Sequence, residues 1–256
     1  MAEATHEWTS LQVKDAVATV SIDRPSSKNA FHPGVANELI DQLHRARRTD
    51  GVRVVVITGS GEYFSSGADL GWLQETFTAA PEARAADAEV NARLLRTIDE
   101  LELPVVGRVN GSVFGGALGI VAACDISVAV TDAHFGFREV LLGLAPGVTV
   151  PYLLRAMGES ALRHLFLTGA SIPAAEAYAH GLVHVVCAKD ELEQRVSDVV
   201  GALLRGSTSA HAAVKEIIRE ARPVEAPSLD ATMSALTSAL WDDAEVRSRV
   251  GSFLSK

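Results

Sequence analysis

The sequence is poor in several features that would each define a class of protein. It has only two cysteines in 256 residues, Cys124 and Cys187, which excludes a disulfide-stapled scaffold and predicts free thiols in a reducing compartment. Its most apolar stretch, residues 117–123, is far too short to span a bilayer. The first residues lack the basic start and apolar run of a signal peptide. We therefore expect a cytoplasmic protein that does not insert into a membrane.

Positive charge is also scarce. The chain has 23 Lys and Arg against 32 Asp and Glu, a net charge of −9, and no basic tail or block, so nucleic acids and anionic membranes are poor partners. His180 and His184 are four residues apart, but Gly181 interrupts any helix between them, and we predict no metal site. The motifs of serine hydrolases, P-loop enzymes and dinucleotide-binding domains are absent as well.

What remains is a globular composition, 48% hydrophobic and 21% charged, with alternating strand and helix patterns. Residues 11–22 alternate around Lys14-Asp15 as a hairpin does. Helical spacing follows from Pro33, from about Leu70, and over 83–101 and 115–123. Continuous apolar runs at 52–58, 104–109 and 126–130 predict strands buried on both faces. This alternation predicts an α/β fold with layered sheets.

After Pro146 the pattern becomes mostly helical, with one short strand over 182–187. We predict an α/β core over residues 1–190 and a C-terminal helical region over 191–256. The expected helices cover 150–157, 160–166, 173–180, 190–204, 211–220 and 229–254.

Two glycine-containing turns each lie between a buried strand and a helix. They are Gly67-Ala68 and Gly115-Gly116. Glycine lets the backbone turn sharply and approach a ligand, and the following N–H groups are the unpaired ones of a helix start. Two such N–H groups on one carbonyl oxygen would form an oxyanion hole.

Motifs along essentially the whole chain, in order, resemble the crotonase (enoyl-CoA hydratase/isomerase) superfamily. The resemblance implies a spiral of ββα units with a C-terminal helical trimerisation region, an acyl-CoA thioester substrate, no cofactor beyond the coenzyme A of that substrate, and a homotrimer or dimer of trimers. The matching segments are Arg24-Pro25, Lys28-Asn29-Ala30, 54–59, 64–70, Asn110-Gly111, Gly115-Gly116, Cys124-Asp125, Phe135-Gly136 with Glu139, Gly143 with Pro146-Gly147, Leu167-Thr168-Gly169, 175–177, Gly181-Leu182-Val183 and Phe253-Leu254.

The resemblance also implies residue roles. Ala68 and Gly116 match the oxyanion-hole donors, and Glu139 matches the catalytic acid/base. The apolar neighbours of Glu139 predict a raised pKa, whereas the alternative is an ion pair with Arg138; we favour the first, since adjacent residues of an extended chain point to opposite faces. Ser66 and Lys28 match positions beside the coenzyme A, although Lys28 also fits a solvated lysine.

Other side chains have two interpretations. Trp72, Leu73 and Phe77 line an acyl pocket or pack in the core, and Trp241 and Phe253 in the tail belong to a subunit interface or a pocket lid. Solvated helix faces fit the arginines of 83–101 better than a role in binding a substrate carboxylate; these are Arg84, Arg93 and Arg96. Asp69 is predicted to cap a helix.

The chain departs from the family pattern at Gly119, where ordinary hydratases have a second glutamate. The motifs around this pocket position more closely resemble methylglutaconyl-CoA and isohexenylglutaconyl-CoA hydratases, so the leading hypothesis is a hydratase, a lyase, of that substrate type. The alternatives are a Δ3,Δ2-enoyl-CoA isomerase with Glu139 as its one carboxylate, and an acyl-CoA-binding protein without catalysis.

Overall fold

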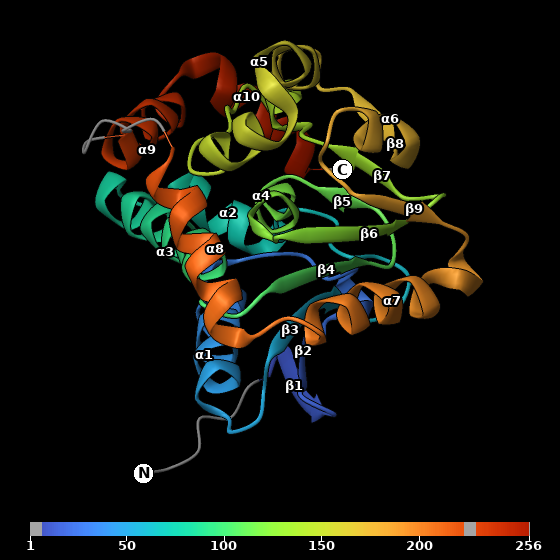
Figure 1. Ribbon diagram of the computed structural model, residues 1–256. Coiled ribbons are helices and arrows are strands. Elements are labelled where there is room, and N and C mark those ends of the chain that lie inside the picture. Colours follow the sequence, from blue (N-terminus) through green and yellow to red (C-terminus); the bar gives the residue numbers. More distant parts are fainter. Residues whose placement is uncertain (1–6, 223–228, 256) are drawn as a thin grey trace.

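The computed structural model describes residues 7–222 and 229–255 (Figure 1). Its central element is a six-stranded sheet in the order β1-β2-β3-β4-β6-β9. β1 and β2 form the predicted antiparallel hairpin, and all other neighbours are parallel. The strands are β1 (Thr9–Lys14), β2 (Val17–Ile22), β3 (Val54–Gly59), β4 (Val105–Val109), β6 (Ile126–Val130) and β9 (Val185–Cys187).

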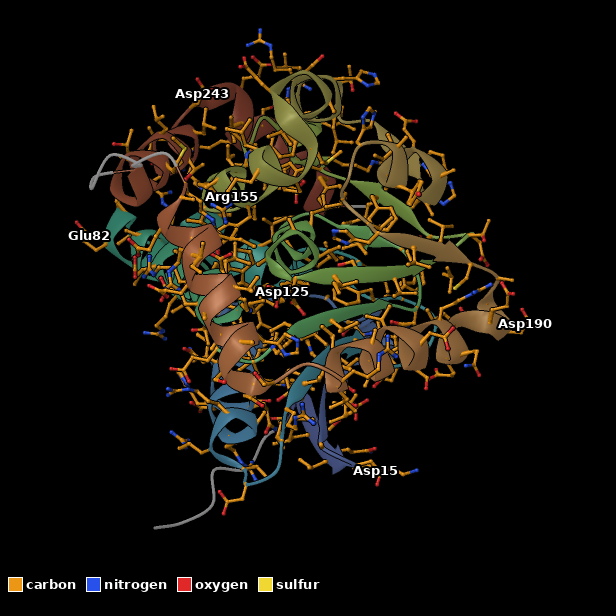
Figure 2. The ribbon with its side chains drawn as sticks, in the orientation of Figure 1. Asp15, Glu82, Asp125, Arg155, Asp190 and Asp243 are labelled. Carbon is orange, nitrogen blue, oxygen red and sulfur yellow. The ribbon has the colours of Figure 1, made fainter. Side chains whose placement is uncertain are left out.

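The sequence of β3 explains its central place in the sheet. All six of its residues are buried, as expected for a parallel strand covered on both faces. α1 (Pro33–Arg48) packs on β1 and β2, and α7 (Leu192–Leu204) packs on β3, β4, β6 and β9. α8 (Thr208–Glu220) carries Lys215, whose Nζ lies 2.6 Å from the Asp125 carboxylate at the start of β6 (Figure 2). The predicted α/β layering is confirmed.

A second, three-stranded sheet was not predicted. It consists of β5 (Val113–Phe114), β7 (His134–Gly136) and β8 (Ser171–Pro173), in the order β5-β7-β8. Strands of two or three residues are too short to show an alternating pattern. α4 (Ala117–Ala123) packs on β5, and α6 (Ala174–Ala179) packs on β7 and β8, whereas α5 (Val150–Thr168) packs on α4. α5 is interrupted at Gly158, whose φ of 76° is not helical. This interruption agrees with the two helical stretches predicted for this region.

The tail differs from its prediction. One helix was expected over 229–254, but the structure has α9 (Leu229–Leu240) and α10 (Ala244–Leu254). The side chain of Asp243 accepts hydrogen bonds from the N–H groups of Glu245 and Val246, at 2.8 and 3.2 Å, and so begins a new helix. A capping residue inside an apolar pattern was the missed signal.

The helices after residue 190 have two different partners. α7 contributes Leu192, Val196 and Val200 to the main core under the sheet. By contrast, α9 contacts α3 (Pro81–Glu100), and α10 contacts α2 (Leu70–Thr78) and the short 3₁₀ helix η2 (Glu139–Leu142). A separate apolar cluster joins them: Leu73, Leu144, Trp241, Val246 and Val250. The tail therefore covers part of its own chain, and Figure 2 shows Glu82 of α3 and Asp243 before α10 on one side of the molecule.

Two further 3₁₀ turns, η1 (Pro25–Ser27) and η3 (Lys189–Glu191), complete the elements of the described ranges. Across residues 7–222 and 229–255, none of the helices combines the length and the apolar character that crossing a membrane requires.

Candidate active site

The structure brings the two predicted glycine turns together. The Phe114 N–H donates to the Ser65 carbonyl at 3.0 Å, which joins the two segments just before their glycines. Gly67 has φ 94° and Gly115 has φ 59°, both in the left-handed region that favours glycine. A Cβ on Gly115 would lie 3.4 Å from the Gly67 Cα, so the backbones approach closely.

The two N–H groups predicted to bind an oxyanion both lie at one cavity. Among the described residues, neither the Ala68 N–H nor the Gly116 N–H donates a hydrogen bond to a protein group. The flanking backbone is fixed, because the Phe31 N–H donates to the Gly67 carbonyl at 2.8 Å and the Asp69 N–H donates to the Phe31 carbonyl at 2.9 Å. Fixed, unpartnered N–H groups of this kind suit a carbonyl oxygen that gains charge during a reaction.

Two buried asparagines hold the loop before the first turn. Asn110 Oδ1 accepts from the Gly59 N–H at 3.2 Å, and its Nδ2 donates to the Gly61 carbonyl at 2.9 Å. Asn29 Nδ2 donates to the Tyr63 carbonyl at 2.7 Å. Both residues belong to the family-like motifs, yet no role was assigned to them. The predicted helix cap is confirmed, since Asp69 Oδ1 accepts from the Gly71 N–H at 2.9 Å.

Glu139 lies at the start of η2, directly after β7 and Phe137. Its Oε1 is so close to Gly115 that any side chain there would overlap it, and its Oε2 is buried without a hydrogen-bond partner in the part of the chain that the structure describes. Burial raises the pKa of Glu139 from 4.5 to about 7, although the backbone N–H groups of Glu139 and Arg138 act in the opposite direction. The predicted raised pKa therefore has a structural cause.

The alternative of a Glu139–Arg138 ion pair is not seen in the described residues. However, the reason given for rejecting it was wrong. Arg138 has φ −95° and ψ 2°, which is a turn into a 3₁₀ helix and not extended chain. The turn leaves Arg138 exposed and sends Glu139 inward.

Two cavities meet at Glu139. We call cavity A the space of about 190 Å³ between α2, α3, α9 and residues 144–149, and cavity B the space of about 490 Å³ beside α10 and β5. Both are lined by Ala68, Leu73, Glu139 and Leu144. Gly116 lines cavity A, and Gly115 lines cavity B.

The other predicted site residues divide between these spaces. Trp72 lines cavity A along with Leu73, and Ser66 lines cavity B. The Ser66 N–H donates to the Lys28 carbonyl at 2.9 Å, so the two residues expected beside coenzyme A are neighbours. The Lys28 ammonium lies over the Tyr63 ring, 5.2 Å from its centre.

Gly119, expected in the pocket, lies buried in α4 and lines neither cavity. A Cβ at this position would lie 2.8 Å from Thr149 Cγ2 and 2.9 Å from Leu95 Cδ1. The space that a second glutamate would need is therefore filled by neighbouring side chains.

Sequence reasoning missed the polar lining of cavity A. The solvated position expected for Arg84 is wrong, because this residue is only 6% exposed and faces the cavity, whereas Arg93 is exposed. Trp241 lines cavity A and Phe253 lines cavity B. Both residues therefore lie at cavities of their own chain. The one available signal was the spacing of Arg84 and Asn91, which places them on one face of α3.

The raised pKa of Glu139 predicts a pH-dependent stability. The folded state holds this proton more tightly than the unfolded chain, so the stabilisation is complete below pH 4.5 and is lost as the pH rises through about 7. Relative to a Glu139→Gln variant, which does not titrate, the wild type should lose roughly 2–3 kcal/mol of unfolding free energy between pH 5 and pH 8. Urea denaturation of both proteins at the two pH values measures this. A difference that stays constant with pH would contradict the burial of this carboxyl.

Comparison with known proteins shows the family to which this chain is related. The family model for enoyl-CoA hydratase/isomerase matches residues 12–256. The crotonyl-CoA hydratase of Syntrophomonas wolfei is 31% identical over 96% of this chain and 97% of its own. The trans-2-decenoyl-[acyl-carrier-protein] isomerase of Streptococcus mutans is 31% identical over 80% of this chain and 79% of its own. The solved enoyl-CoA hydratase of Shewanella pealeana has a TM-score of 0.82 and 31% identity, covering 97% of this chain and 94% of its own.

Proposed function

Because the chain belongs to the enoyl-CoA hydratase/isomerase family, we propose that it is a lyase that adds water to an α,β-unsaturated acyl-CoA thioester. One observation carries the proposal: a buried carboxyl with a pKa of about 7 lines the same cavity as Ala68 and Gly116, whose N–H groups have no protein partner among the described residues. A branched glutaconyl thioester of the methylglutaconyl type is the substrate that the motifs around Gly119 favour.

In the proposed reaction, the Ala68 and Gly116 N–H groups donate to the thioester oxygen. Water attacks the β-carbon, and the Glu139 carboxylate takes one proton from that water. The negative charge that develops on the thioester oxygen is stabilised by the two N–H groups. Glu139 then returns the proton to the α-carbon, which completes the addition of water and restores the carboxylate. A pKa near the working pH suits a group that both accepts and donates this proton.

The substrate would occupy both cavities. We expect the acyl chain in cavity A and the thioester at the residues that the two cavities share. The coenzyme A moiety would then extend through cavity B, beside Ser66 and its neighbour Lys28. The reaction as proposed needs no cofactor beyond that coenzyme A. A homotrimer or dimer of trimers in the cytoplasm completes the proposal.

A second candidate is a Δ3,Δ2-enoyl-CoA isomerase. The observation that favours it is the packing at Gly119, which leaves no room for the second carboxylate of ordinary hydratases. In this reaction Glu139 would remove a proton from one carbon of the acyl chain and return it to another, with no water consumed.

Isotope-labelled water separates the candidates. A panel of 2-enoyl and 3-enoyl thioesters is incubated in water carrying both heavy hydrogen and heavy oxygen, and the products are analysed by mass spectrometry. We expect hydroxyacyl products with one heavy oxygen from 2-enoyl esters. A 2-enoyl product from the 3-enoyl ester, without heavy oxygen, would identify the isomerase. Tight thioester binding with no exchange at the α-carbon would leave only the non-catalytic binding protein.

A further inference from the structure

We propose that cavity A contains an anion subsite centred on Arg84, which selects acyl groups that end in a carboxylate. The inference rests on the proposed acyl-CoA function, because it assumes that the cavity holds an acyl chain. It adds a specificity-determining residue in the first turn of α3, at the wall of cavity A.

Arg84 is a buried cation with unused donors. Its side chain is only 3% exposed, and Nη2 donates to Asp242 Oδ1 at 3.0 Å. Within residues 7–222 and 229–255, as far as their side chains are described, Nε and Nη1 are buried and have no hydrogen-bond partner. A guanidinium remains charged at any pH at which proteins function, so this desolvated cation favours a second anion. Because Arg84 lines cavity A, the terminal carboxylate of an acyl group in that cavity would be the second anion.

The remaining unpartnered polar atoms around the cavity favour an acceptor-rich ligand. Thr76 Oγ1 and Thr149 Oγ1 are buried without partners among the described side chains, and both hydroxyls can donate. Apart from Glu139 Oε2, the only unpartnered atom at cavity A that can accept but not donate is Asn91 Oδ1, in the described part of the chain. A carboxylate accepts several hydrogen bonds and donates none, which matches donors that outnumber acceptors.

The charged neighbours leave Arg84 incompletely neutralised. Its partner Asp242 has a side chain that is 61% exposed and lies 3.9 Å from Arg247 Nη2 as well, so one solvated carboxylate serves two arginines. Asp87 is another carboxylate that lines cavity A, but its Oδ2 already accepts from Trp72 Nε1 at 2.8 Å. Such a partly solvated ion pair contributes little, and a desolvated ligand carboxylate would interact more strongly.

Binding of saturated thioesters tests the subsite without relying on turnover. Adipoyl-CoA and hexanoyl-CoA differ only in a terminal carboxylate or methyl group, and glutaryl-CoA and pentanoyl-CoA form a second such pair. By titration calorimetry, we expect the wild type to bind the carboxylated ester of at least one pair about tenfold to a hundredfold more tightly. Arg84→Met should abolish this preference and leave the Kd for the methyl-terminated ester within about threefold, a change of under 1 kcal/mol.

Other variants keep the test decisive if Arg84→Met does not fold. Asp242→Asn removes the competing carboxylate and should increase the preference. Arg93→Met, on the exposed face of the same helix, should leave it unchanged. Equal affinity for both members of each pair in the wild type, or a preference that survives Arg84→Met, would overturn the subsite. Equally tight binding of 6-hydroxyhexanoyl-CoA and adipoyl-CoA would also overturn it, as a neutral polar site. Failure of the proposed hydration would instead appear as absent turnover with this binding preference intact.

Discussion

Glu139→Gln should lower kcat by roughly 10²–10⁴-fold, with thioester binding changed only a few-fold. The amide has nearly the same shape as the carboxyl but cannot take a proton from water or return one to carbon. Its burial should not destabilise the fold, because at neutral pH the wild type already holds this carboxyl half protonated, with a pKa of about 7. Steady-state kinetics with the substrate identified by the thioester panel, together with calorimetric binding of a saturated analogue, measures both effects.

A companion pH profile makes the Glu139 prediction more specific. In the wild type, kcat/KM should change with an inflection near pH 7, and the residual activity of Glu139→Gln should lack it. Asp87→Asn is a useful comparison, since Asp87 also lines cavity A but contacts Trp72 and not the glycine turns. Turnover of Glu139→Gln close to that of the wild type would show that another group moves the proton.

Gly115→Ala replaces no ionisable residue, yet it should reduce kcat by on the order of 10²-fold. The new methyl group would overlap Glu139 Oε1, so the carboxyl must be displaced from its position. A displacement of about 1 Å in a catalytic group can have an effect of this size. The positive φ of Gly115, 59°, adds roughly 1–2 kcal/mol of backbone strain, so the unfolding free energy should fall as well.

Gly201→Ala, in α7, is the matched control for this substitution. A Cβ at Gly201 meets no atom within 4 Å, and its helical position should gain up to about 1 kcal/mol of stability with unchanged kinetics. The pH profile separates displacement from general loss of structure, because a displaced and more hydrated Glu139 should titrate below pH 7. Normal turnover with an unshifted profile in Gly115→Ala would contradict the close packing of these two residues.

Much of the fold followed from local patterns. The buried run of β3, the hairpin of β1 and β2, and helices α1 to α3 each carry a periodicity that is complete within the segment. The errors occur where the pattern is not local. β5, β7 and β8 exist only because segments far apart in sequence pair with one another. The split between α9 and α10 depends on a cap, Asp243, inside an otherwise continuous apolar pattern.

The site shows the same division. The glycine turns and Glu139 could be recognised from motif and setting, but the lining of cavity A could not. Arg84 lies between exposed residues in the first turn of α3, and nothing in its own neighbourhood in the sequence shows that α9 and Trp241 cover it. Gly119 also changes its meaning in three dimensions, because the apparent gap in the motif is filled by Leu95 and Thr149.

Cavity A is lined in part by three residues near the end of the chain, Thr237, Ser238 and Trp241. The complete cavity can therefore form only late in synthesis of the chain. Ala68, Gly116 and Glu139 leave the ribosome long before these tail residues, and the strands that precede them, β3, β5 and β7, can pair before the tail exists. The binding space remains open on one side until α9 reaches α3, a contact between parts of the chain that are well over a hundred residues apart. Such a distant contact forms late in folding. A nascent chain should therefore acquire its parallel sheet first and its ability to retain an acyl thioester last.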